Sequence, residues 1–332
     1  MTLINCTPWG EMANGPAYLF RLTNSSGAFV ELTNYGATIV SIHVHDRNGR
    51  LGNVILGYDN LQGYMADTNY MGATIGRFAN RIAGAAFELE GSFYQLEAND
   101  GVNTNHGGHS GFHGKVFSHE IDENSIIFRY ISPDGEGGFP GTLQLTVTYQ
   151  WTEGNALLIR YHATTDQPTI ANFTNHAYFN LSGEKSGIDD HKLRIYSDNI
   201  VEANPHHIPT GLILPAGALT FNGGNVGQKI AEEDGRRTGL NTCYVLNKQN
   251  TQLHQACQLA DPKTGRNLTI HTSYPGILLY TGDYITGETH QPFGGLCLEC
   301  QYFPDSPNQA TFPDTILRPG EFYDHSIQFH FN

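Results

Sequence analysis

The stretch Asn172-Phe173-Thr174-Asn175-His176-Ala177-Tyr178-Phe179-Asn180-Leu181 decides the fold of this chain. Side chains of a strand alternate between its two faces. Read as one strand, the segment has a face that is rich in hydrogen-bonding groups: Asn172, Thr174, His176, Tyr178 and Asn180. The other face is mostly apolar. This separation predicts either the wall of a polar cavity or a half-buried strand whose polar face meets water.

Strand signals dominate the rest of the 332 residues. Residues 142–151 alternate strictly between apolar and polar side chains, which is typical of a strand with one buried face. Similar runs occupy residues 37–44, 125–131, 156–163, 192–196, 267–271, 276–281, 295–302 and 321–331. We expect a helix only in short stretches, for example near residues 226–234. Many strands without alternating helices predict an all-β fold, a large antiparallel β-sandwich, as a single domain over residues 1–332.

Charge and composition exclude several classes of protein. The formal net charge is −14, with 32 acidic and 18 basic residues, which disfavours binding to nucleic acid or to anionic membranes. No run approaches the roughly 20 apolar residues that span a bilayer, and the first ten residues do not resemble a secretory signal. The five cysteines, an odd number, argue against a disulfide framework. We therefore expect a cytoplasmic protein.

Sixteen histidines raise the question of a metal site. His106-Gly-Gly-His109 and His113 crowd a glycine-rich loop, but no spacing matches a zinc finger or the helical His-Glu-x-x-His pattern. We expect no metal, and we expect surface positions for two further pairs, which are His43 with His45 and His206 with His207. Serine-nucleophile and phosphate-loop motifs are also missing from the sequence.

Glu299 is the most unusual acidic residue. It lies in the middle of the apolar run 295–302, where a carboxylate is costly unless it is paired or functional. One reading is a salt-bridged glutamate at the rim of a sheet, and the other is a general base. The nearby Cys297-Leu-Glu-Cys300 has the spacing of a redox motif, but a strand is the wrong setting for thioredoxin-like chemistry.

Several motifs together resemble one family. The segment 172–181 is similar to the signature of galactose mutarotases, the aldose 1-epimerases. Residues 76–82 resemble the substrate-binding loop of this family, in which an Asn-Arg pair contacts the sugar. Further matching segments follow in the order of the family, from about Phe29 to Phe329: residues 105–108, 132–141, 298–305 and 317–321.

The resemblance implies a β-sandwich with a shallow sugar cleft. The family interconverts the α and β anomers of free aldoses with no metal and no organic cofactor. Carried over to this sequence, Glu299 would be the general base and His176 the general acid. Four further residues would bind the sugar: Asn80, Arg81, His106 and Tyr178. The expected partner is a small-molecule sugar, and the chain would work as a monomer or a homodimer.

The chemistry explains why these residue types are needed. Ring opening removes a proton from the C1 hydroxyl and delivers another to the ring oxygen. A carboxylate and an imidazole on opposite sides of the hemiacetal can carry out both proton transfers. Each transfer is typically worth ~10²–10⁴-fold in rate. Ring closure reverses the two roles, so one pair of residues serves both half-reactions.

Two positions depart from the family pattern. Asn241 stands where an aspartate normally binds sugar hydroxyls, and Leu278 stands where a glutamine often contacts the substrate. An amide keeps hydrogen-bonding capacity but loses the charge-assisted bond. We expect the reaction to be retained, Asn241 still to bind substrate, and the sugar preference to be shifted. Phe303, Tyr178 and Phe293 are candidates for stacking on the pyranose.

Two other functions stay open at this point. A relative acting on a 6-substituted hexose, such as a hexose 6-phosphate, would need additional Arg or Lys side chains at the rim of the cleft. A non-catalytic sugar-binding module would not need an acid and a base facing each other. The presence of both Glu299 and His176 favours an enzyme.

Overall fold

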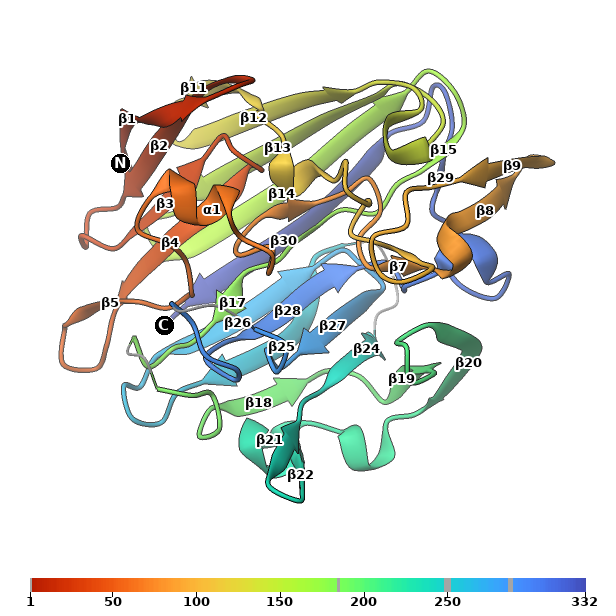
Figure 1. Cartoon of the computed structure of the whole chain (residues 1–332). Helices are drawn as coiled ribbons and strands as arrows, with labels where there is room; N and C mark the ends of the chain where they lie inside the picture. Colours follow the sequence, from red (N-terminus) through yellow and green to blue (C-terminus); the bar gives the residue numbers. More distant parts are fainter. Residues whose placement is uncertain (1, 184–185, 248–251, 286–288) are drawn as a thin grey trace.

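Antiparallel strands are the main secondary structure of the computed structural model, which describes residues 2–183, 186–247, 252–285 and 289–332 (Figure 1). The largest sheet has nine strands in these described residues. In spatial order they are β11 (Ser118–Asp122), β12 (Ser125–Ser132), β13 (Leu143–Trp151), β14 (Ala156–Thr165), β30 (Tyr323–Phe331), β26 (Asn267–Thr272), β25 (His254–Ala260), β18 (Lys192–Ile195) and β21 (Asn222–Asn225).

Two smaller antiparallel sheets pack against the nine-stranded sheet. The five-stranded sheet has the order β1 (Leu3–Met12), β2 (Gly15–Thr23), β3 (Phe29–Thr33), β4 (Thr38–His45) and β5 (Leu51–Asn53). The six-stranded sheet has the order β17 (Tyr178–Phe179), β28 (Leu296–Gln301), β27 (Gly276–Tyr280), β24 (Asn241–Val245), β19 (Asn199–Ala203) and β20 (Pro209–Pro215).

Short elements complete the chain. The two-stranded sheets pair β7 (Arg81–Ile82) with β10 (Thr104–Asn105), β6 (Thr74–Ile75) with β16 (Thr174–Asn175), β15 (Thr169–Ile170) with β29 (Ile316–Leu317), β8 (Ala86–Leu89) with β9 (Ser92–Gln95), and β22 (Ala231–Glu233) with β23 (Arg236–Thr238). The α-helix is α1 (Leu61–Met65), and the 3₁₀ turns are η1 (Ala83–Ala85), η2 (Phe112–Gly114), η3 (Glu136–Gly138), η4 (Gly217–Leu219), η5 (Val226–Lys229) and η6 (Ser306–Asn308).

The core lies between the layers, as the alternating patterns predict. The inward residues of β13 at positions 143, 145, 147, 149 and 151 are all buried. Phe20 of β2 contacts Phe128 of β12 edge to face, with ring centroids 5.6 Å apart. Phe179 of β17 contacts Phe329 of β30 in the same way at 5.1 Å. These contacts join both smaller sheets to the large one and confirm the all-β antiparallel sandwich.

The short helical stretch expected near residues 226–234 is present only in its first part. The chain forms only the 3₁₀ turn η5 there and then enters the hairpin β22–β23. Asp234 and Gly235 both have positive φ, at 50° and 74°, as the two central residues of a tight hairpin turn require. In the described part of the chain, no helix has the length and apolarity needed to cross a membrane.

The segment 172–181 is not one strand. Its Thr174–Asn175 pair belongs to β16 and its Tyr178–Phe179 pair to β17, and these two pieces join different sheets. Every residue of the segment is buried, so the alternative of a half-buried strand whose polar face meets water is wrong. The amides of the segment bond to the main chain, as when Asn180 donates to the Gly294 carbonyl. The segment is therefore a buried link that holds two sheets together.

Candidate active site

A cleft of about 810 Å³ opens beside the six-stranded sheet. It is lined by β28, β27 and β24, by segments from the first 110 residues and by residues 204–208. All seven residues predicted for the site line this cleft: Glu299, His176, Asn80, Arg81, His106, Tyr178 and Asn241. The structure thus brings together side chains that are more than 200 positions apart in the sequence.

Glu299 sits in the middle of β28, opposite Leu278 of β27. The residue is only 1% exposed, and its Oε2 atom has no hydrogen-bond partner among the described residues. Burial raises the pKa of the Glu299 carboxyl to about 8, and the Arg81 guanidinium opposes part of that rise. The alternative of a salt-bridged glutamate at a sheet rim is wrong, because this carboxyl lies inside the cleft floor.

His176 meets Glu299 at the deep end of the cleft. The Nε2 atom of His176 lies 3.7 Å from the Oε1 atom of Glu299. Burial lowers the pKa of the imidazole to about 4, so at neutral pH the contact joins two neutral groups and is not an ion pair. The two side chains are adjacent, too close for a sugar ring to lie between them. The expectation that they face each other from opposite sides of the sugar is therefore wrong.

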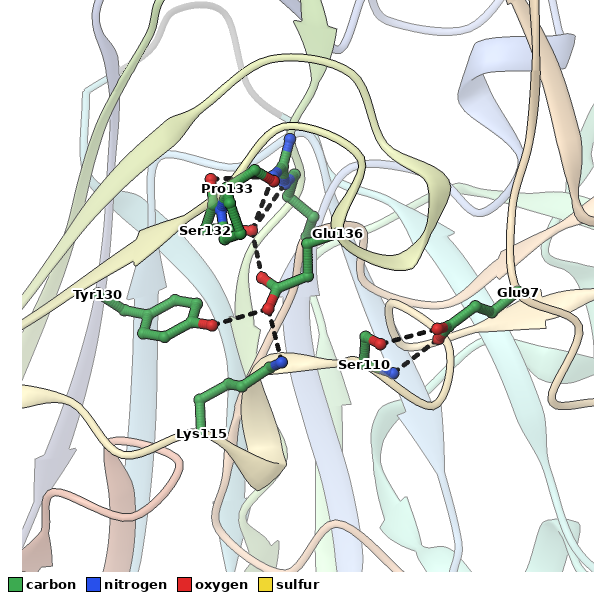
Figure 2. A network of polar contacts seen from close by, with 8 residues as sticks. Glu97, Ser110, Lys115, Tyr130, Ser132, Pro133 and Glu136 are labelled. Carbon is green, nitrogen blue, oxygen red and sulfur yellow. Dashed lines mark hydrogen bonds and ion pairs between the residues drawn. The ribbon is translucent and has the colours of Figure 1, made fainter. Parts of the chain in front are cut away.

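The loop that carries His106 is fixed from two sides. Gly107 has φ +84°, and a Cβ atom there would lie 2.1 Å from the carbonyl oxygen of Gly76, so only glycine fits. On the other side, the Glu97 carboxylate accepts hydrogen bonds from the backbone N–H and the hydroxyl of Ser110, both at 2.7 Å (Figure 2). These contacts leave the His106 side chain buried against the cleft.

The Asn-Arg pair enters the cleft through a strained turn. Asn80 has φ +69°, and its side-chain Oδ1 accepts the backbone N–H of Arg81 at 2.8 Å. The backbone N–H of Asn80 in turn donates to Nδ1 of His106 at 3.2 Å. The Nε atom of Arg81 lies 2.7 Å from Oδ2 of Asp100, which holds the guanidinium at the cleft wall. Asn80, Arg81 and His106 are thus one connected unit.

A buried polar network around Arg77 fixes the chain just before the turn at Asn80. The guanidinium of Arg77 is 2% exposed and donates to the hydroxyl of Ser132 at 2.7 Å and to the Pro140 and Gly141 carbonyls at 2.8 Å. Figure 2 shows that Ser132 also donates to Glu136. The Glu136 carboxylate accepts further hydrogen bonds from Tyr130 at 2.7 Å and Lys115 at 2.6 Å. The segment 132–141 therefore serves as a structural anchor.

The remaining predicted residues line the floor and side of the cleft. Tyr178 is 2% exposed, and its hydroxyl donates to the Asn69 carbonyl at 3.1 Å. Asn241 begins β24, and Leu278 lies in β27 beside Glu299, so both departures from the family pattern face the substrate space. Phe303 and Phe293 are buried and do not line the described cleft, which leaves Tyr178 from the stacking candidates.

Sequence reasoning missed most of the cleft rim. The missed residues include Asn69, Tyr70, Asp100, Tyr280, Tyr284, His206 and His207. The two histidines were expected at the loop surface, and His206 is indeed exposed, but both also line the mouth of the cleft. Apart from Tyr280, these residues have no sequence signal of their own, since their place in the cleft depends on how distant loops pack. Tyr280 could have been found, because alternation along β27 puts it on the same face as Leu278.

The donor set resembles a metal site but does not suit one. Glu299, His176 and His106 each offer one ligand atom, and these atoms lie within 4.8 Å of one another. However, Nδ1 of His106 already accepts the backbone N–H of Asn80, so the proton of the neutral ring is on Nε2. A metal needs an unprotonated ring nitrogen. His106 therefore presents an N–H donor, which fits a sugar oxygen better than a cation.

Comparison with known proteins identifies the family of this chain. The family model described as aldose 1-epimerase matches residues 18–330. Human galactose mutarotase is 35% identical over 344 residues, covering 100% of this chain and 99% of the relative. The aldose 1-epimerase of Escherichia coli (strain K12) is 33% identical, covering 99% of each chain.

Solved structures agree as well. An aldose epimerase homologue from C. elegans has a TM-score of 0.88 at 30% identity, covering 95% of this chain and 99% of its own. Galactose 1-epimerase from Lactobacillus acidophilus has a TM-score of 0.87 at 26% identity, covering 100% and 99%. The motifs, the fold and these matches lead to one conclusion: the chain belongs to the aldose 1-epimerase family.

Proposed function

We propose that Glu299 and His176 carry out the two proton transfers by which an aldose changes its anomeric form. Aldose 1-epimerases are isomerases that interconvert the α and β anomers of aldoses, and this chain is a member of that family. The reaction opens the hemiacetal, allows rotation about the C1–C2 bond and closes the ring on the other face of C1.

In the proposed opening step, the Glu299 carboxylate removes the proton of the C1 hydroxyl. The Nε2–H of His176 gives its proton to the ring oxygen as the bond from C1 to that oxygen breaks and C1 becomes an aldehyde. Both oxygens are bonded to C1, so two adjacent side chains can reach them from one side of the sugar. Closure runs the same transfers backwards.

A neutral imidazole is suited to this role. Burial keeps the pKa of His176 low, so the ring donates a hydrogen bond without carrying a charge of its own. A neutral imidazole that donates to an oxygen on which negative charge develops is a known catalytic arrangement. Donors fixed in a site with little water stabilise such charge more than donors in water do. We assign the N–H of His106 and the guanidinium of Arg81 to the stabilisation of the same negative charge on the sugar. Hydroxyls of the sugar would be bound by Asn80, Tyr178 and Asn241.

The observation that carries the proposal is the state of Glu299. A carboxyl that is 1% exposed, with one oxygen unpartnered and a raised pKa, is costly to the fold. Such groups occur preferentially where chemistry needs them. Its position 3.7 Å from a second titratable side chain, in a cleft, matches an acid–base pair.

The substrate class we propose is a free hexose. Human galactose mutarotase acts on galactose by its name, but Asn241 and Leu278 alter two positions of this cleft, so we propose a different preference among hydroxyl configurations. Nothing favours a 6-phosphate substrate, because Arg81 is the sole Lys or Arg among the described residues of the cleft and it is paired with Asp100. A binding module is disfavoured by the cost of keeping Glu299.

We also propose that residues 1–332 act as one domain, in the cytoplasm, as a monomer or homodimer. One apolar cluster includes residues of all three large sheets, which supports a single cooperative unit. The five cysteines, Cys6, Cys243, Cys257, Cys297 and Cys300, are free thiols, which fits a reducing compartment. Analytical ultracentrifugation of the full chain would decide between the two assembly states.

Polarimetry on freshly dissolved galactose and glucose tests the function directly. We expect the chain to accelerate the approach to anomeric equilibrium above the spontaneous rate. Glu299→Gln and His176→Asn should each lower kcat by ~10²–10⁴-fold, while sugar still protects the folded variants against heat. Wild-type activity in both variants would contradict the assignment, and no acceleration by the wild type would contradict the function.

A further inference from the structure

A thiol contacts Nδ1 of His176, the ring nitrogen other than the one that approaches Glu299. Cys297 belongs to β28, two residues before Glu299 and on the same face of that strand. It is fully buried, and its Sγ atom lies 3.4 Å from Nδ1 of His176. This distance is within the range of a hydrogen bond that involves sulfur. The reacting nitrogen of the same ring, Nε2, points toward Glu299.

The contact alone is compatible with either tautomer of the ring, so its direction depends on the chemistry of the two groups. Burial raises the pKa of the Cys297 thiol well above its usual range, so the thiol keeps its proton and can donate it. A neutral imidazole has one N–H and one lone pair, and the partner of one nitrogen fixes the state of the other. A neutral thiol sulfur is a weak acceptor, so the arrangement that uses S–H as donor and Nδ1 as acceptor is favoured.

We propose that Cys297 is a positioning residue that donates its S–H to Nδ1 of His176 and thereby holds the ring proton on Nε2. Without this donor the proton can move to Nδ1, and Nε2 then presents a lone pair to the sugar. The acid of the proposed reaction would be lost although His176 stays in place.

In His106, too, a hydrogen bond to Nδ1 fixes the tautomer, but the donor is a backbone N–H, which cannot act as an acceptor. There the backbone N–H of Asn80 occupies Nδ1, which leaves the proton on Nε2. The cleft therefore holds two imidazoles in the same tautomer, one fixed by the main chain and one by a thiol. The ring centroids are 5.1 Å apart and the planes are nearly perpendicular, at 83°.

The thiol also contributes during the reaction. As Nε2 gives its proton to the ring oxygen, negative charge develops on the imidazole. A hydrogen bond from S–H to Nδ1 becomes stronger at that moment, since bonds to charged groups are stronger than bonds between neutral ones. Interactions that strengthen in the transition state raise kcat and leave KM largely unchanged.

The test combines NMR with kinetics on the full chain. Long-range ¹H–¹⁵N spectra report which ring nitrogen carries the proton, and the signals of His176 are assigned by their loss in His176→Asn. The variants are Cys297→Ala, which removes the donor, and Cys297→Ser, which restores an O–H donor. Cys300→Ala is the matched control, because Cys300 is also fully buried but faces the other side of β28.

We expect the wild type and Cys297→Ser to carry the proton on Nε2, and Cys297→Ala to shift it toward Nδ1. The kcat of Cys297→Ala should fall by roughly five- to tenfold at unchanged KM, as expected for one lost hydrogen bond. Cys300→Ala should lower thermal stability without changing the tautomer of His176 or kcat. A wild-type proton on Nδ1, or an unchanged tautomer in Cys297→Ala, would overturn the proposal.

The kinetic part rests on the proposed function, whereas the tautomer does not. If the wild type fails to accelerate mutarotation, the function is wrong, and the NMR measurement still decides the role of Cys297. If the wild type is active and the tautomer of Cys297→Ala is unchanged, the role of Cys297 is wrong and the function stands.

Discussion

The deep end of the cleft and its rim are built in different ways. Glu299 and His176 are 1% and 4% exposed and are held by strand pairing and by a buried segment that links two sheets. The rim is formed by loops and turns, where Val102 and Tyr284 are 75% and 60% exposed. Burial at the deep end shifts the pKa values of both groups far from their usual range. The comparison suggests that the sheets determine the proton chemistry, while the loops select the substrate.

The largest effect should come from removing the titratable carboxyl at the deep end. The pKa of Glu299 is 4.5 in an ordinary setting and about 8 in the folded protein. As pH rises from 4.5 to 8, the unfolded chain therefore loses this proton first, and the free energy of unfolding falls by up to about 5 kcal/mol. The Glu299→Gln variant has no such titration. Its free energy of unfolding should therefore exceed that of the wild type at pH 9 and be much closer to the wild-type value at pH 5.

Denaturant unfolding at both pH values measures this difference. The matched rim variant is Asp100→Asn, which breaks the ion pair with Arg81 near the surface and should change stability by less than ~1 kcal/mol. A stability difference between Glu299→Gln and wild type that is the same at pH 5 and pH 9 would contradict the raised pKa.

Two arginines four positions apart sharpen the comparison further. Arg77 is buried behind the site and donates to Ser132, Pro140 and Gly141. Arg77→Met leaves those buried acceptors without their donor, and it should lower the free energy of unfolding by about 3–5 kcal/mol. Thermal unfolding measures this loss. A destabilisation below ~1 kcal/mol would mean that segment 132–141 does not anchor the site.

Arg81 should show the opposite behaviour, with little effect on stability and a clear effect on rate. Arg81→Met should lower kcat/KM by about 10–100-fold, since it removes a charge-assisted bond to the sugar. The Arg81 charge also opposes the rise in the pKa of Glu299, so its removal should move the pH profile to more alkaline values. A profile that is unchanged or moves to acid would place Arg81 too far from the carboxyl to act on it.

The smallest effect concerns the sugar preference. Asn241→Asp and Leu278→Gln restore the residue types that galactose mutarotases usually have, and each should raise galactose turnover by up to about tenfold relative to glucose. The double variant should exceed either single one. Polarimetry on both sugars gives the ratio, and a ratio that none of the three variants changes would contradict a role of these positions in selectivity.

The sequence predicted the deep end better than the rim for physical reasons. An acidic residue within an apolar strand carries a large penalty, which made Glu299 visible without any structure. The motif that contains His176 was equally visible, although its division between two sheets was not, because alternation does not show where a chain changes sheets. The adjacency of the two side chains also depends on sheet packing, and the expected placement on opposite sides of the sugar was wrong.

The rim illustrates what sequence patterns lack. Asp100, His206 and Tyr284 come from three separate parts of the chain and meet only in the folded cleft. Exposed loop residues have no desolvation cost, so nothing in the sequence pattern distinguishes them. The strands were predicted well because burial forces their alternation, as in β13. The short helix α1 and the hairpin β22–β23 were missed because local turn chemistry decided them.

The pH dependence of kcat/KM tests the central claim most directly. Because the proposed base acts only when ionised and its pKa is about 8, kcat/KM of the wild type should rise nearly tenfold per pH unit from pH 5 to 7 and level off above pH 8. The spontaneous rate is subtracted at each pH. A kcat/KM that is flat or falls between pH 5 and 8 would show that the ionised Glu299 is not the base.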